Sequence, residues 1–257
     1  MELEACLRFL PGPDGLNPVV PESAKTFHNS GEPGPPVMVN LPGCELELLL
    51  CGVGPVAAAL NLGLHLGRKR ERPLNGIVNI GIAGSYDTGA APPGSLVLAT
   101  EEVFPEFGIW PHRDGSGDPV PLPLSFPQAE LPDKKVFTRL ALEPDRALGN
   151  MGLNWHSGLP RGTSISVAGV SGTLQRARHM AALAGGLTEN MEGFSLALGA
   201  ASAGISFAEL RAVSNEAGLR PPQGWDMPAA LDALGRGTRE LLAPFLCVSQ
   251  KTAPSLS

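Results

Sequence analysis

The sequence predicts an α/β protein with a mainly parallel sheet covered by helices on both faces. Three continuous apolar runs bounded by turn residues read as buried strands, at residues 45–52, 76–84 and 94–103. An Ala- and Leu-rich segment, residues 55–72, separates the first two runs and ends in a basic cluster, as a helix with a favourable C-terminal charge does. Strands that alternate with helices along a chain favour parallel pairing.

The second half of the chain continues this alternation. We expect strands in 162–172 and 206–218, and helices at 173–186, about 189–203 and near 227–244. Two segments rich in Pro and Gly, 11–43 and 104–133, are expected to be irregular. We assign residues 1–249 to one domain and expect a disordered tail at 250–257.

Composition narrows the classes of partner. The 257 residues carry a net charge of -6, and only 17% of them are charged, so the chain has no basic field for a nucleic acid or an anionic membrane. The four cysteines form no Cys-x-x-Cys pair, no signal sequence opens the chain, and no apolar run is long enough to span a bilayer. We therefore expect a reduced, soluble, cytoplasmic protein.

Several motifs resemble known sites without completing them. The segment "GVGPVA" at 52–57 matches a dinucleotide fingerprint, but no acidic residue ends the next strand, so we interpret it as a tight turn. The segment "AGVSGT" lacks the spacing of a nucleophile elbow. The five histidines stand singly, so we predict no metal and no cofactor.

Small and polar residues gather at three predicted element ends. Ala83 and Gly84 end one strand and leave backbone groups open to a ligand at the carboxyl edge of the sheet. Glu192 begins a helix, where its carboxylate can cap the helix or accept hydrogen bonds from a vicinal diol. Ser214 and Asn215 end another strand, where Asn can form a turn or contact a ligand.

The order of the segments "CGVGPVAAAL", "NIGIAGSYDTGAAPPGSLVLATEEV", "ENMEG" and "RAVSNEAG" resembles the nucleoside phosphorylase and nucleosidase superfamily, which includes methylthioadenosine nucleosidases. The segments "ATEEVFPEFGI", "SVAGVSGTLQRA" and "GWDMPAAL" are most similar to the futalosine hydrolase family. The resemblance implies a three-layer α/β/α sandwich with a central twisted mixed sheet. It also implies hydrolysis of the N-glycosidic bond of futalosine, which releases hypoxanthine and dehypoxanthine futalosine in menaquinone biosynthesis.

The resemblance also implies roles for individual residues. Glu192 matches the glutamate that binds the ribose hydroxyls, and Met191 would pack against the sugar. Asn215 stands where adenine-specific nucleosidases carry Asp, and its amide can donate to a 6-oxo group such as that of hypoxanthine. Glu4 matches the glutamate that activates water, and Arg211 is a further position near that water.

Four other positions complete the expected substrate site. Ala83, Gly84 and Ser214 would line it, and Val170 would stack beside the base. The aromatic carboxylate of futalosine needs a cationic or donor-rich partner, for which His112 and Arg113 are candidates, although a solvated loop charge is the favoured interpretation of both residues.

The start of the chain departs from the family pattern. In the family a short apolar strand precedes the glutamate segment, whereas "MELEACLRFL" opens this chain with helical spacing. We expect that the start codon is placed too late, because an unpaired interior strand edge is strongly disfavoured. The alternative is a protein that lacks the first strand and holds Glu4 poorly.

Three other functions use the same residues. A purine nucleoside phosphorylase or another purine nucleosidase would share the fold, but a phosphorylase needs arginines for phosphate, and "GIAGSYDTG" offers none. A non-catalytic nucleoside binder fits a truncated N-terminus, and a nicotinamide-dependent dehydrogenase is the third alternative. The substrate class is a small-molecule nucleoside, and the family resemblance implies a homo-oligomer.

Overall fold

The computed structural model describes residues 36–68, 73–109, 121–155, 158–220 and 224–246. A six-stranded mixed sheet forms its centre, in the order β10-β3-β9-β8-β4-β7. Its strands are β3 (Ile77–Ser85), β4 (Leu96–Val103), β7 (Arg139–Ala141), β8 (Arg161–Ser166), β9 (Gly186–Asn190) and β10 (Phe207–Glu216). The mixed sheet of the expected α/β fold is confirmed.

The pairings explain why the sheet is mixed rather than mainly parallel. β10 and β3, β4 and β8, and β8 and β9 run parallel, while β3 and β9, β4 and β7, and β10 and β4 run antiparallel. Because β10 also pairs with β4, the five strands β10, β3, β9, β8 and β4 form a closed ring of pairings. The backbone hydrogen bonds between these five strands bring together strands that are far apart in the sequence.

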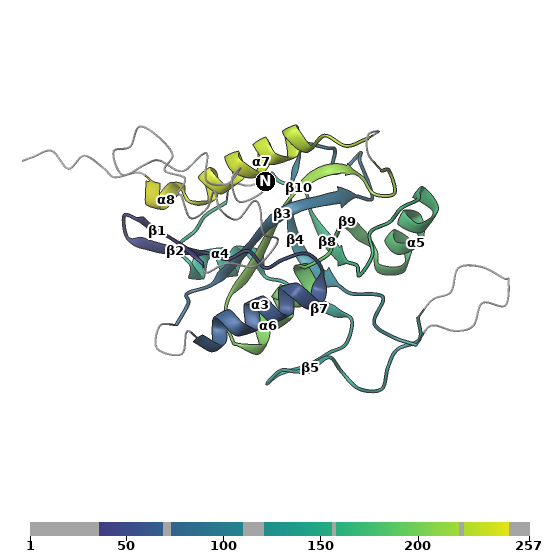
Figure 1. Ribbon diagram of the computed structural model, residues 1–257, viewed down its shortest axis with the longest axis horizontal. Coiled ribbons are helices and arrows are strands. Elements are labelled where there is room, and N and C mark those ends of the chain that lie inside the picture. Colours follow the sequence, from purple (N-terminus) through teal and green to yellow (C-terminus); the bar gives the residue numbers. More distant parts are fainter. Residues whose placement is uncertain (1–35, 69–72, 110–120, 156–157, 221–223, 247–257) are drawn as a thin grey trace, which may run out of the picture.

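Helices cover both faces of the sheet (Figure 1). α3 (Pro55–Arg68) and α6 (Gly193–Ser202) pack together on one face, while α4 (Pro144–Asn150) and α7 (Met227–Leu241) pack on the other. α5 (Leu174–Ala184) lies against β8 and β9, and the short α8 (Ala243–Leu246) follows α7. The three-layer arrangement follows from these contacts.

Local signals account for the helix ends. Thr173 caps α5 by accepting a hydrogen bond from the Arg176 N–H, and Gly185 ends that helix in the left-handed conformation. Asp226 caps α7 through the Ala229 N–H, with a proline in its first turn. Alanines in α6 and α7, such as Ala197 and Ala233, are almost fully buried and let these helices approach the sheet closely.

Two sequence expectations were wrong at the start of the described region. The run 45–52 is not a strand of the central sheet: among the described residues, β2 (Cys44–Leu48) pairs with β1 (Val37–Leu41) alone, in a separate hairpin. β1 itself lies in a segment expected to be irregular. The physical reason is alternation, because Glu45 and Glu47 separate Leu46 from its neighbours, which is the pattern of a half-exposed antiparallel strand.

A third expectation was wrong around residue 189. The helix expected at about 189–203 begins only at Gly193, because residues 186–190 form β9. β9 contains buried polar residues, among them Thr188 and Asn190, so its sequence lacks the apolar signal of a buried strand. The strand expected over 162–172 likewise ends at Ser166, and α4 was not expected.

One long edge of β3 is largely unpaired among the described residues. β3 pairs with β10 along one edge, but on the other edge only Gly84 and Ser85 pair, with β9.

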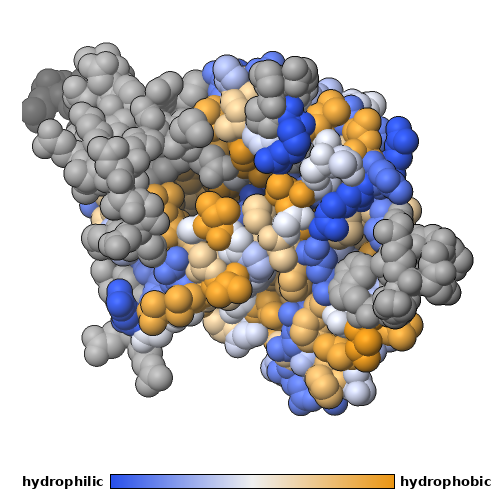
Figure 2. Space-filling model, turned by 45° about the vertical axis from the view of Figure 1, so that its right-hand side comes forward, coloured by the Kyte–Doolittle hydropathy of each residue, from blue (hydrophilic) through white to orange (hydrophobic). Residues whose placement is uncertain are grey.

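The expectations about residues 1–10 and 250–257 fall outside the described residues. Within the described ranges no helix is long and apolar enough to cross a membrane. Figure 2 shows one face of the molecule, on which apolar patches alternate with hydrophilic ones.

Candidate active site

A cavity of about 1050 Å³ runs along β3 and reaches the carboxyl ends of β3, β9 and β10. All eight described residues that the sequence assigned to the site line this cavity: Ala83, Gly84, Val170, Met191, Glu192, Arg211, Ser214 and Asn215. Strand ends of an α/β sheet are where ligand crevices form. The fold therefore brings together residues that are up to 132 positions apart in the sequence, from Ala83 to Asn215.

The carboxylate of Glu192 faces the cavity rather than capping its helix. Glu192 occupies the N-cap position of α6 but makes no side-chain capping bond. Asn190 takes that role, because its Oδ1 accepts hydrogen bonds from the N–H groups of Glu192 and Gly193 at 2.9 and 2.7 Å. Glu192 Oε1 accepts from the Gly54 N–H at 2.9 Å, and Oε2 lies 3.9 Å from Arg211 Nη1. The capping alternative for Glu192 is wrong.

The turn before α3 supplies the N–H group that meets Glu192. Gly52 and Gly54 have φ values of +81° and +88°, a conformation that residues with side chains rarely adopt. The strand before this turn, β2, lies outside the central sheet, so the "GVGPVA" motif is not part of a parallel βαβ dinucleotide unit. The motif is a tight turn that fixes a donor at the cavity wall.

Arg211 is a buried cation in the middle of β10. It is 3% exposed, its Nε donates to Glu209 Oε1 at 3.0 Å, and its Nη1 donates to the Ile82 carbonyl at 3.4 Å. Its Nη2 has no hydrogen-bond partner among the described residues. Burial opposes the charge, but the carboxylates of Glu209 and Glu192 outweigh burial and raise the pKa of Arg211. The guanidinium therefore stays charged and keeps a spare donor.

Asn215 lies within β10, at a bulge where the pairing with β3 shifts after Val213. Its Nδ2 donates to the Glu216 carbonyl at 2.7 Å, and its Oδ1 lies 2.8 Å from Ser214 Oγ. Asn215 also forms a β-bridge with Trp225. The amide retains one unused donor and one unused acceptor position. Asn215 is part of the strand, so the turn-forming alternative is wrong.

The loop after β8 is held in place by a buried carboxylate. Glu189 Oε1 accepts from the Ser171 N–H at 2.8 Å, and its Oε2 accepts from Ser171 Oγ at 2.6 Å and Tyr86 Oη at 2.7 Å. Val170, 39% exposed, precedes Ser171 and lines the cavity. Met191 packs with Tyr86 in a small apolar cluster. Glu189 thus fixes the position of the Val170 loop.

Sequence reasoning missed a buried polar network beneath the cavity. It consists of eight side chains from all five strands of the ring: Asn79, Glu102, Ser164, Ser166, Thr188, Asn190, Glu209 and Arg211. The available signal was the alternation of polar residues in "TSIS" and "AELR", which resembles a solvent-facing strand. Only the position of α6 over these strands shows that this face is buried.

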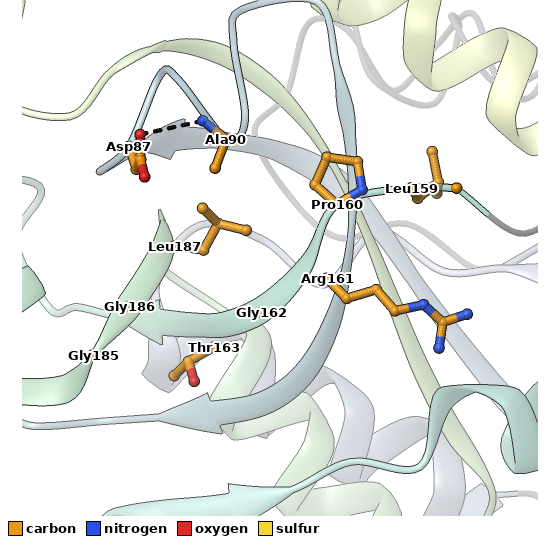
Figure 3. A pocket seen from close by; sticks show the side chains of 11 residues that line it. Asp87, Ala90, Leu159, Pro160, Arg161, Gly162, Thr163, Gly185, Gly186 and Leu187 are labelled. Atoms are coloured by element: carbon orange, nitrogen blue, oxygen red, sulfur yellow. Dashed lines mark hydrogen bonds between the residues drawn. The ribbon is translucent and has the colours of Figure 1, made fainter.

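Other candidate residues and a second cavity complete the picture. Glu4, His112 and Arg113 lie outside the described residues. A cavity of about 550 Å³ lies between the loop after β3 and the strands β8 and β9, and no predicted site residue lines it. There the Asp87 side chain accepts from the Ala90 N–H, while Arg161 points away from Leu187 (Figure 3) and pairs with Asp145 at 2.6 Å. The larger cavity is therefore the candidate active site.

Solved structures of known proteins share this fold. A putative methylthioadenosine nucleosidase from Weissella paramesenteroides is 18% identical, with a TM-score of 0.59, over 82% of this chain and 83% of its own. A 5'-methylthioadenosine/S-adenosyl homocysteine nucleosidase from Helicobacter pylori is 18% identical, with a TM-score of 0.55, over 86% of this chain and 88% of its own. At this identity the likeness concerns the fold alone.

Sequence comparison gives a narrower relationship. The model of the phosphorylase superfamily matches residues 16–243. A futalosine hydrolase from Thermus thermophilus is 35% identical over 207 residues, which are 79% of this chain and 84% of the relative. A futalosine hydrolase from Streptomyces coelicolor is 33% identical over 228 residues, 83% of this chain and 88% of the relative. The chain therefore belongs to the phosphorylase superfamily and, within it, to the futalosine hydrolase family.

Proposed function

We propose that this chain hydrolyses the N-glycosidic bond of futalosine and releases hypoxanthine and dehypoxanthine futalosine, a step in menaquinone biosynthesis. The observation that carries the proposal is the relationship to curated futalosine hydrolases at 33–35% identity over most of both chains. The cavity supports it, since a small nucleoside needs an enclosed site with a few directed polar groups.

Glu192 orients the ribose in this proposal. As the base leaves, the sugar gains oxocarbenium character, so interactions that fix its hydroxyls strengthen in the transition state. Two observations support this role: Glu192 lines the cavity, and its carboxylate is fixed in direction by the Gly54 N–H at 2.9 Å and the buried Arg211 guanidinium at 3.9 Å. Met191, next to it, supplies an apolar surface for the sugar.

Asn215 selects the base. Its amide offers one donor and one acceptor position, a set that matches a 6-oxo group and a protonated N7. Ser214 and the Glu216 carbonyl hold the amide by 2.8 and 2.7 Å contacts, which limits its rotation. Ala83 and Gly84 form the neighbouring wall of the cavity, where a Cβ added at Gly84 would be in van der Waals contact with Asn215 Nδ2 at 3.5 Å. Val170 stacks on the base from its loop.

Arg211 positions the attacking water molecule, and Glu4 activates it. The spare N–H groups of Arg211 donate to the attacking oxygen and hold it near the sugar. Glu4 acts as the base that activates the water, a role that rests on the family resemblance alone. A hydrolytic site needs no other nucleophile.

Charge around Arg211 favours water over phosphate as the nucleophile. Phosphorolysis requires cationic side chains that bind the attacking phosphate dianion. The Arg211 guanidinium already faces two carboxylates, Glu209 at 3.0 Å and Glu192 at 3.9 Å, so its field is largely neutralised. A phosphate dianion beside Glu192 would meet repulsion, whereas a neutral water would not.

The test of this proposal measures the release of hypoxanthine from futalosine in phosphate-free buffer, with chromatography as the detection method. We expect turnover without phosphate, and Glu192→Gln to lose about 10- to 100-fold in kcat/KM, because a hydrogen bond to a charged group contributes about 1.5–3 kcal/mol. Glu143→Gln is the matched control, since Glu143 is an exposed carboxylate paired with Arg146. Release that requires phosphate would indicate a phosphorylase, and futalosine binding without release would indicate a binder.

The same proposal includes a homo-oligomer in the cytoplasm. Support for the oligomer comes from an apolar stripe at i, i+4 and i+8 on α3, formed by Val56, Leu60 and Leu64, which are 80%, 58% and 49% exposed. Support for a reducing compartment comes from Cys44 and Cys51, which are both free thiols.

A further inference from the structure

Two glutamates lie side by side in the buried polar network. Glu102 of β4 and Glu209 of β10 are both 0% exposed. Their carboxyl groups are hydrogen-bonded to each other. A Cβ built on Gly193 would lie 2.2 Å from Glu102 Oε1 and 2.5 Å from Glu209 Oε2, which places both carboxyl groups under the first residue of α6.

The charges around Glu102 and Glu209 require that one of the two carboxyl groups is protonated. The described charged groups that face Glu102 are Glu209 and Arg211 of β10, with Glu192 on the other side of the guanidinium. The remaining partners, from β3, β8 and β9, are uncharged amides and hydroxyls, and α6 carries no charged residue. Two fully buried carboxylates therefore share one cation, and that cation also faces a third carboxylate. A second uncompensated buried charge would be very costly.

The hydrogen bonds show which carboxyl group holds the proton. Glu209 receives the Arg211 Nε at 3.0 Å, the Asn79 Nδ2 at 2.9 Å and the Ser164 Oγ at 3.2 Å. Burial opposes ionisation of Glu209, but the Arg211 charge outweighs it and lowers its pKa. Burial first, and then the Glu209 charge, raise the pKa of Glu102 well above its usual range. Glu102 is the neutral donor and Glu209 the anion.

The pair is connected to both polar walls of the cavity. Glu209 bonds Arg211 directly. Glu102 Oε1 accepts from Asn190 Nδ2 at 2.9 Å, and Asn190 Oδ1 in turn holds the backbone N–H of Glu192. Ser166 links Glu102 to the same turn, because its Oγ lies 2.8 Å from Glu102 Oε2 and accepts from the Phe194 N–H at 2.7 Å.

We propose that Glu102 and Glu209 share a single proton and, as one unit, position Arg211 and the turn that presents Glu192. Neither glutamate lines the cavity, so both are positioning residues. The effect on turnover rests on the proposed function. The shared proton is a property of the free protein and is measured without substrate.

The first test is the pH dependence of unfolding. In the unfolded chain both glutamates ionise near pH 4.3, so above that pH folding takes up one proton at Glu102. Because the folded pKa of Glu102 is raised, its contribution to stability is full below the unfolded pKa and is lost as pH rises toward the folded pKa. Glu102→Gln keeps a neutral donor and releases no proton on unfolding. In a pH series from about 5 to 8, its unfolding constant relative to the parent should therefore fall as pH rises toward the folded pKa of Glu102, by at most about tenfold per pH unit.

Glu101→Gln is the matched control for this titration. Glu101 is the next residue of β4 but is partly exposed, and it pairs with Arg139. Its substitution removes a carboxylate from the same strand and should not produce the fall expected for Glu102→Gln in the same pH series. If Glu102→Gln also shows no pH dependence in this range, the pair holds no shared proton and the proposal is overturned, whatever the protein does with futalosine.

The second test is the asymmetry between the two glutamates in turnover. Glu102→Gln should keep kcat/KM within about threefold, because glutamine preserves the neutral hydrogen-bonded form. Glu209→Gln should lose at least tenfold, because Arg211 loses its anionic partner. If Glu209→Gln does not fold, Asn79→Ala removes one donor to Glu209 while leaving the ion pair, and should lose activity in the same direction to a smaller extent. Equal losses in Glu102→Gln and Glu209→Gln would refute the positioning role.

Discussion

Replacement of Gly193 by alanine distinguishes local helix propensity from tertiary packing. Gly193 is the first residue of α6, and alanine is favoured over glycine in a helix by about 1 kcal/mol. From propensity alone, Gly193→Ala should stabilise the protein. The structure predicts the opposite, because the added Cβ would lie 2.2 Å from Glu102 Oε1 and 2.5 Å from Glu209 Oε2.

The magnitude follows from what those carboxyl groups can do. Both are fully buried and tied to neighbouring strands, so they cannot rotate away without breaking hydrogen bonds. Overpacking of this kind costs about 1–3 kcal/mol, and a broken buried bond to a charged group costs about 1.5–3 kcal/mol more. After subtracting the propensity gain, we expect a net loss of about 1.5–5 kcal/mol, a fall of about 3–20 °C in Tm for a chain of this size.

Thermal and urea unfolding followed by circular dichroism measure this difference. Gly63→Ala is the matched control, because Gly63 is also helical but an added Cβ there meets no atom within 4 Å. That substitution should stabilise the protein by up to about 1 kcal/mol. The packing argument is refuted if Gly193→Ala proves as stable as the parent or shifts in the same direction as Gly63→Ala.

Three further predictions concern the cavity and the surface. Asn215→Asp should weaken hydrolysis of 6-oxopurine nucleosides and raise the relative rate on 6-aminopurine nucleosides, measured as a ratio of kcat/KM; an unchanged ratio removes Asn215 from the base site. Burial and the nearby Glu192 carboxylate raise the pKa of Cys51 to about 11. Alkylation of Cys51 by iodoacetamide, measured by peptide mass spectrometry, should therefore be slow at pH 8 and faster in Glu192→Gln. Equal rates in the two proteins would contradict an effect of Glu192 on Cys51. Leu60→Glu should lower the mass found by light scattering, and an unchanged mass excludes the α3 stripe as the contact.

Local patterns in the sequence are sufficient to predict the fold class, the family and eight of the residues that line the candidate site. Continuous apolar runs identified β3 and β4, because strands buried on both faces need apolar residues at successive positions. Motif order identified the superfamily, and eight of the residues named from it line one cavity. These signals are local in the chain, so they can be read without coordinates.

The burial of the polar strands and the hydrogen-bond partners of their side chains are visible only in the folded structure. β9 and the "ELR" part of β10 carry charged and amide side chains, which in isolation indicate exposure rather than burial. They are buried because partners on other strands, such as Glu102 for Asn190, 88 residues away, satisfy their hydrogen bonds. The closed ring of strand pairings depends on the same long-range contacts, which no local pattern encodes.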